Sequence, residues 1–231
     1  MINLLPILYG NGLSSCFSCP PELFAALIRI NHLRAQFHSA SQSDATDRHA
    51  AAMDILRAIR GFVPDAWALR LNPSINSAPL QPQPSRPASL QRPLKGWLQG
   101  WLAMGRIYQC AVAIYCISAL FSNTKGVGDA MSGVRKSCRT MLVQQLQSLH
   151  DCENTQLRKL VIWPLVIAGI GTGTGDEDTK GFILKELAWI SKAVGIAAPL
   201  LAREFLQKVW MRPVEDRRWD GLFDRPYLFA V

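Results

Sequence analysis

The stretch LVIWPLVIAGIGTGTGDEDTKG, residues 160 to 181, decides between two fold classes. An apolar run leads into alternating glycines at positions 169, 171, 173 and 175, and an acidic turn then precedes an apparent helix. If the apolar run is a strand, the glycines form a phosphate-binding loop between a strand and a helix. If the run is helical, the same glycines form a joint between two helices. The glycine spacing and the neighbouring charges separate these alternatives.

The glycines do not have the spacing of a nucleotide-binding loop. In the dinucleotide fingerprint G-x-G-x-x-G, the last position would be Thr174, Asp176 or Asp178, depending on which glycine begins the motif. The P-loop pattern G-x-x-x-x-G-K-[S/T] is also absent from this stretch. Asp176, Glu177 and Asp178 would place negative charges where a phosphate binds, at the positive end of the following helix. The stretch is therefore predicted to be a helix–loop–helix joint.

The helix before the joint is expected to begin near Asn154 and to contain Pro164. Proline has no N–H, so the hydrogen bond to the carbonyl of Leu160 cannot form and the helix should kink. Gly169 is expected to end this helix, and Asp178 or Thr179 to cap the next one. Pairing of residues 161–167 in a sheet would contradict this interpretation.

The rest of the chain also has helical spacing, and no stretch alternates apolar and polar residues as a strand with hairpin turns would. Predicted helices span 21–39, about 46–61, 94–122, 129–150, 154–169, 178–195 and 199–210. The predicted fold is all-α, a single helical domain over residues 1–231 with about seven main helices. A Pro-rich loop or linker is expected at 73–93, and an extended C-terminal tail should pack through Trp219, Phe223 and Tyr227.

The composition is that of a globular protein. The 231 residues are 49% hydrophobic and 18% charged, and the formal net charge is +8. The apolar runs at 110–121 and 160–170 are shorter than the roughly 18 residues that cross a bilayer, and the N-terminus is a poor signal peptide. We expect a soluble, intracellular protein with no membrane partner, in which the six cysteines are reduced.

A weak zinc-binding pattern lies near the N-terminus. Cys16, Cys19, His32 and His38 satisfy the loose spacing of a two-Cys, two-His finger. The second cysteine is followed by two prolines, where a finger needs a strand. The histidines are six residues apart on a predicted helix, so they point in different directions. We expect no metal at these residues and keep zinc-dependent nucleic-acid binding as a minor alternative.

No catalytic constellation is visible. All four histidines fall on predicted helices or helix ends, and neither G-x-S-x-G nor H-E-x-x-H occurs. We therefore expect a protein without catalytic residues or a cofactor of its own. The alternative is a stand-alone helical enzyme or small-molecule-binding protein, which would use the glycine-rich loop or an aromatic-lined cavity along the helix at 94–122.

Five segments resemble the fungal-specific transcription factor domain, the regulatory region found C-terminal to a binuclear zinc cluster in fungal activators. They occur in the family's order, at 19–34, 55–67, 108–120, 161–169 and 182–210. The positions that carry the resemblance include Cys19, Pro20, Trp163, Pro164, Ala168, Gly169 and Trp210.

The resemblance implies a nuclear domain that controls RNA polymerase II transcription in response to an effector or a partner, although the cytoplasm is an alternative location. Transcriptional regulatory proteins are the implied partners. A small apolar effector and a homodimer are compatible with this role.

Two departures from the family pattern limit what is carried over. The family reads DNA through a six-cysteine module that begins C-x2-C-x6-C, whereas here the cysteine after Cys16 and Cys19 is Cys110. We therefore expect no direct sequence-specific DNA binding by this chain, and zinc only if an N-terminal cluster lies outside it. A fragment, a truncated paralogue and a stand-alone regulator all remain open. The loop after Gly169 is also longer than the family's short acidic turn.

Overall fold

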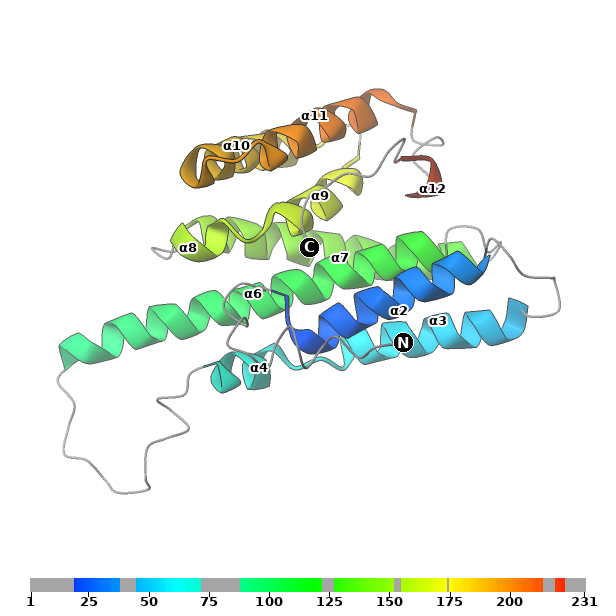
Figure 1. Ribbon diagram of the computed structural model, residues 1–231, viewed down its shortest axis with the longest axis horizontal. Coiled ribbons are helices and arrows are strands. Elements are labelled where there is room, and N and C mark those ends of the chain that lie inside the picture. Colours follow the sequence, from blue (N-terminus) through cyan, green and yellow to red (C-terminus); the bar gives the residue numbers. More distant parts are fainter. Residues whose placement is uncertain are drawn as a thin grey trace, which may run out of the picture.

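The structure is a computed structural model, and it describes residues 19–37, 45–71, 88–121, 127–151, 155–173, 175–213 and 219–222. Every regular element in these ranges is a helix, which confirms the all-α prediction. Residues 161–167 are not part of a sheet (Figure 1). The structure does not describe Cys16, His38, Phe223, Tyr227 or residues 73–87 of the Pro-rich segment.

Helices α6 (Ala88–Leu120) and α7 (Val127–His150) form the central layer of the bundle (Figure 1). Helix α6 packs against helices on both sides and against α7. Residues 110–117 in its C-terminal half have no charged or amide side chain and are all buried. A helix that is apolar all round must be surrounded by others, and this explains why α6 is central.

Helix α6 also contains a segment, Gly96–Leu120, that is long and apolar enough to cross a membrane by length and composition. In the most hydrophobic part of this segment, 72% of the residues are buried against the rest of the fold. The burial is that of the core helix of a globular bundle, so the length and hydropathy follow from packing between two layers.

One outer layer contains α2 (Pro21–Phe37), α3 (Ala45–Arg60) and α4 (Pro64–Arg70). Proline begins both α2 and α4, at positions where the missing N–H would have no partner in the helix. The helices predicted from the sequence do not include α4. The structure shows a short helix there because Trp67 is buried against Gly105 of α6, where an added Cβ would lie 3.0 Å from the Trp67 ring.

The opposite layer contains α8 (Thr155–Arg158), α9 (Ile162–Ile170) and the antiparallel pair α10 (Glu177–Val194) and α11 (Ala198–Met211) (Figure 1). The short helix α12 (Trp219–Leu222) packs back onto α6. Asp176 caps α10, so the cap lies two residues before the predicted Asp178. Gly195 ends α10 in the left-handed conformation, at φ 76°, which glycine adopts without strain.

The predicted helix from Asn154 to Gly169 is wrong as one element, because the chain forms two helices separated at residues 159–161. Pro164 is the third residue of α9. The first four N–H groups of any helix have no carbonyl partner within it, so a proline in this turn removes no helical hydrogen bond. The proline is thus accommodated by beginning a new helix, not by kinking a continuous one.

The predicted loop at 73–93 is also wrong at its C-terminal end, because α6 already begins at Ala88 and includes Pro93. Pro93 leaves the carbonyl of Ser89 without its helical donor. This end of α6 extends beyond the other helices (Figure 1), so water can bind that carbonyl. The low cost of the missing bond there lets the helix continue through the proline.

Candidate functional site

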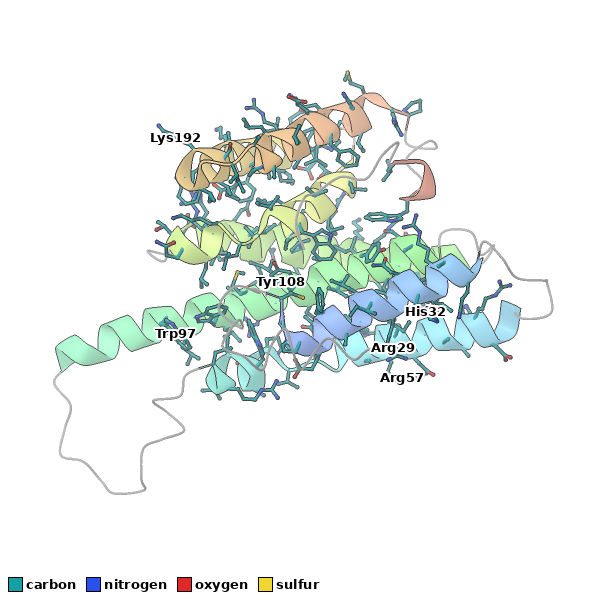
Figure 2. All side chains as sticks on the ribbon, in the orientation of Figure 1. Arg29, His32, Arg57, Trp97, Tyr108 and Lys192 are labelled. Carbon is teal, nitrogen blue, oxygen red and sulfur yellow. The ribbon has the colours of Figure 1, made fainter. Side chains whose placement is uncertain are left out.

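The break between α8 and α9 leaves the carbonyl of Leu160 outside any helix. In a continuous helix this oxygen would accept from the N–H of residue 164, which Pro164 lacks. The hydroxyl of Tyr108, from the central helix α6, donates to it at 2.9 Å. Tyr108 is buried between the layers (Figure 2). A residue 52 positions earlier in the chain therefore satisfies the carbonyl that the proline leaves open.

Trp163 lies in an aromatic cluster that joins the layers. Its ring is stacked against Tyr108 at 6.3 Å between centroids and meets Tyr115 edge-on at 6.2 Å. Tyr115 in turn contacts Trp219 of α12 at 4.9 Å, and its hydroxyl donates to the side chain of Asn31 in α2. Aromatic pairs at such separations stabilise packing by roughly 0.5–1.5 kcal/mol each. The Trp163 position of the family pattern is therefore the contact between α9 and the core.

Gly169 lies against α11 so closely that a side chain would not fit. A Cβ added there would lie 2.6 Å from Leu206 Cδ1, and Leu206 is fully buried. The indole N–H of Trp210 donates to the carbonyl oxygen of Gly169 at 2.8 Å. Two of the positions that carry the resemblance, 41 residues apart, are thus in direct contact. Gly169 is needed for this approach of α11, while the last residue of α9 is Ile170, one position later than predicted.

The glycine-rich loop is fixed near both ends by protein groups. Arg139 of α7 donates to the carbonyl of Gly171, and Thr172 is buried with its hydroxyl donating to the carbonyl of Ala168 at 2.9 Å. At the start of α10, the Asp176 carboxylate accepts from the backbone N–H of Thr179. A carboxylate therefore lies at the helix N-terminus, where a phosphate would bind. The joint has the geometry predicted for a helix–loop–helix connection.

A buried ion pair lies one turn from the joint. Arg158 of α8 donates three hydrogen bonds to the Glu186 carboxylate of α10, two from Nη2 at 2.9 and 3.0 Å and one from Nε at 3.3 Å. The carboxylate also meets His150 Nδ1 at 2.7 Å, and the guanidinium lies 3.9 Å from the centre of the Trp189 ring. Glu186 is only 4% exposed. The cluster fastens α8 and the end of α7 to α10.

The sequence did not indicate this cluster. Arg158 and Glu186 are 28 residues apart and lie on different helices, so no local spacing pairs them. The available signal was weak: Glu186 falls on the apolar side of its helix between Ile183 and Ile190, where a charged residue needs a buried partner.

The two described members of the candidate zinc set do not meet. Cys19 is buried, with its thiol 3.6 Å from the carbonyl of Pro20, whereas His32 is exposed and bonded to Gln36 (Figure 2). Helix α2 is continuous from Pro21 to Phe37, so His32 lies ~16 Å along the axis from its start. Zinc bonds of ~2.0–2.3 Å cannot join them. Cys16 and His38 lie outside the described residues.

Buried thiols are the groups with strongly shifted acidity. Burial raises the pKa of Cys110 and Cys116 in α6 from the usual value of 9.0 to about 12. It also raises the pKa of Cys19. Thiols with raised pKa values are neutral at physiological pH and are poor nucleophiles. These cysteines act as small hydrophobic residues.

In the part of the chain that the structure describes, no group of three or more His, Cys, Asp or Glu side chains could hold a metal ion. In the described ranges, the side chains that meet at this place pack against one another, and Arg158 and Glu186 form a buried ion pair there. The candidate site is therefore the place where α8, α9, α10 and α11 meet, and its residues hold these helices together.

The model of the family described as fungal specific transcription factor domain matches residues 5–224. The chain belongs to this family. The family's members are transcriptional regulators, so the chain is a domain of the fungal transcriptional regulator type. The match covers all five segments that resemble the family and the residues that connect them.

A curated relative supports the same assignment. The chain is 29% identical over 215 residues to the phomenoic acid biosynthesis cluster-specific transcriptional regulator of Leptosphaeria maculans (strain JN3 / isolate v23.1.3 / race Av1-4-5-6-7-8). The aligned part is 92% of this chain and 36% of the relative, so the chain spans about a third of that protein's length. No solved structure matches the chain.

The structure gives the fungal-specific transcription factor domain pattern a physical meaning. Trp163 fills the space between α9 and α6, and Gly169 lets α11 approach. Trp210 closes the contact by its hydrogen bond. Cys19 and Pro20 precede α2, and Pro20 accepts from the N–H of Phe24. The Trp-Pro-x-x-x-Ala-Gly segment at residues 163–169 thus docks the α10–α11 pair onto the bundle.

Proposed function

We propose that this chain is a regulatory domain that controls RNA polymerase II transcription in the nucleus by contacting other regulatory proteins. Family membership and the relative, itself a transcriptional regulator, support this proposal. The C-x2-C-x6-C pattern of the zinc cluster does not occur in the 231 residues. The domain is proposed to bind no DNA sequence on its own and to need no metal or other cofactor.

The observation that carries the proposal is the contact between Gly169 and Trp210 at the joint. Residues that the family pattern shares meet each other and serve packing, and none of them presents a nucleophile, an acid or a base to solvent. A pattern of this kind supports a domain that acts by its shape and its surface. The small apolar effector and the homodimer remain part of the proposal as ways in which that surface is controlled.

A tethered reporter tests the regulatory role. The full chain is fused to a heterologous DNA-binding domain, and transcription is measured from a reporter that carries the matching sites in a fungal cell. We expect transcription to change relative to the DNA-binding domain alone. The matched control carries Gly169→Trp, which disrupts the α9–α11 contact. Equal transcription by the fusion and by the DNA-binding domain alone would contradict the proposal.

DNA binding is tested separately, on the purified chain in an electrophoretic mobility shift at physiological salt. The net charge of +8 allows weak, salt-dependent association with any duplex. We expect that association to be independent of sequence and to vanish with unlabelled competitor DNA. Tight binding to one sequence among many would overturn the proposal that this chain lacks its own DNA-reading function.

A further inference from the structure

The end of the α10–α11 pair exposes an apolar surface. Val194, Ile196, Leu200 and Leu201 are 43%, 44%, 41% and 47% exposed, and they lie within eight consecutive residues at the turn between the helices. We call these four residues the hairpin tip. The turn itself is well built, because Gly195 caps α10 and the Ser191 hydroxyl donates to the Ile196 carbonyl at 2.7 Å. The exposure therefore belongs to a fixed surface.

Positive charge surrounds the hairpin tip. Lys192 lies two residues before Val194 and projects into solvent (Figure 2), and Lys185 lies two turns further back on the same face of α10. On α11, Lys208 lies seven residues after Leu201 and so on the same face, about 10 Å away along the axis. Neither these lysines nor Arg203 forms an ion pair among the described residues.

Little negative charge compensates these cations. Between positions 185 and 208 the acidic residues are Glu186 and Glu204. Glu186 is buried in the ion pair with Arg158, which leaves Glu204 as the one acidic side chain at the surface of this segment. An apolar centre with a basic rim is complementary to an apolar segment that carries acidic side chains.

A second copy of the chain is a poor occupant for this surface. A two-fold contact through the hairpin tip would bring Lys192 of each copy towards Lys192 of the other. Like charges around an apolar contact oppose association, and the chain has a net charge of +8. An acidic partner avoids this repulsion, and its carboxylates are attracted to the lysines around the hairpin tip.

We propose that the hairpin tip and its basic rim bind an acidic amphipathic segment of a partner protein, with apolar side chains on Leu200 and Leu201 and carboxylates on Lys192 and Lys208. The inference rests on the proposed function, because it names the chemistry of the regulatory partner. Such a segment would dock as a helix in the usual manner, through apolar anchors spaced at one face.

The test uses the full chain and a fluorescein-labelled peptide with Leu and Phe on one helical face and Asp and Glu on the other. We expect saturable binding in fluorescence anisotropy, and weaker binding as the salt concentration rises from about 50 to about 300 mM. Leu201→Ser combined with Lys192→Glu should weaken binding by about tenfold or more. Both side chains are exposed, and unchanged circular dichroism will show that the variant is folded.

Matched controls make the result specific. Met141→Ser removes an equally exposed apolar side chain, at 46%, on α7, and it should leave the affinity unchanged. A peptide with Lys in place of Asp and Glu should not bind. Equal affinity of the tip variant and the native chain would overturn the inference, and so would salt-independent binding. Concentration-dependent dimerisation that the tip variant abolishes would assign the surface to a second copy and would also overturn it.

The reporter separates this inference from the proposed function. Transcription by the tethered chain does not depend on the synthetic peptide, so a chain that regulates but does not bind the peptide refutes only the inference. A chain that binds the peptide through its tip and leaves transcription unchanged refutes the regulatory role.

Discussion

The hydroxyl of Tyr108 donates to the carbonyl oxygen of Leu160, which lies four residues before Pro164. This bond connects the central helix to the point where the α8–α9 segment changes direction. Pro164 cannot donate to this carbonyl, and the hydroxyl of Tyr108 donates to it instead. The fold thus needs both residues, although they are remote in sequence and each is unremarkable alone.

Tyr108→Phe tests this relationship by removing the donor and keeping the ring. We expect the free energy of unfolding to fall by about 1 kcal/mol, because the carbonyl of Leu160 loses the hydrogen bond from the tyrosine hydroxyl in a half-buried place. Chemical denaturation of the two proteins measures the difference. In a Pro164→Ala background the restored N–H offers the carbonyl another donor, so the same change should cost less there. Equal costs in both backgrounds would show that the two residues act independently.

Gly169→Ala should destabilise the protein. The new Cβ would lie 2.6 Å from the side chain of Leu206, which is fully buried and cannot move aside freely. Overpacking of this kind costs about 1–3 kcal/mol and exceeds the gain in helix propensity of about 1 kcal/mol. Thermal unfolding measures the outcome.

Gly133→Ala is the matched control for this substitution. Gly133 is an exposed position inside α7, and an added Cβ would meet nothing within 4 Å. Its helix propensity gain should therefore appear undiminished, as a small rise in stability. A destabilised Gly133→Ala variant, or a stabilised Gly169→Ala variant, would contradict the packing that the structure shows at the joint.

Removing one half of the buried ion pair should cost more than removing both. Glu186→Leu leaves the Arg158 guanidinium buried without its carboxylate, and losses of about 3–5 kcal/mol are typical of such changes. The double variant Glu186→Leu with Arg158→Met replaces both charges by apolar groups, so much of the stability should return. Denaturant titrations of the two single variants and the double variant give the coupling. Strictly additive losses would exclude a direct pairing.

The buried thiols make stability depend on alkaline pH. Cys110 and Cys116 have pKa values raised from 9.0 to about 12 in the folded protein, whereas the unfolded chain ionises them near 9.0. The unfolded state therefore binds fewer protons between these values, and stability must fall as the pH rises from about 9 to about 12.

Below about pH 8 these two thiols contribute no pH dependence, because both states keep them protonated. Cys110→Ala with Cys116→Ala should therefore make the alkaline part of the profile less steep, with the remaining slope due in part to Cys19, while leaving the neutral part parallel to that of the native chain. Alkylation by iodoacetamide provides an independent measurement: at pH 8 the two thiols should react rapidly only after unfolding. Rapid labelling of both in the native protein would contradict their burial.

The sequence predicts the long helices well because their signals are local. The capping acids before α10, Gly195 after it and the apolar spacing within it all lie inside one segment, and the structure confirms them to within two residues. The all-α class follows from the same local signals. At 160–181 the glycine spacing and the acidic charges both argue against a phosphate-binding loop, and the structure confirms the predicted helix–loop–helix connection.

What the sequence does not predict depends on tertiary contacts. Pro164 indicates an irregularity in the helix, but the sequence does not show that the chain begins a new helix here. Nor does it show that Tyr108, 52 residues earlier, donates to the carbonyl of Leu160. Helix α4 forms because Trp67 finds space beside Gly105. The pairing of Arg158 with Glu186 requires the relative placement of α8 and α10, which no local pattern contains.

The loop between Gly171 and Asp176 can change in length at little cost. Arg139 and the Asp176 cap hold its two ends, and a side chain added at Gly173 or Gly175 would meet no atom within 4 Å, although the φ of 92° at Gly175 favours glycine there. Doubling a flexible loop costs only about 0.6 kcal/mol of closure entropy. Insertions at this point would leave the docking of α10 and α11 intact. The segment is therefore a natural place for lineages to diverge, and a practical one for inserting a reporter domain without disturbing the bundle.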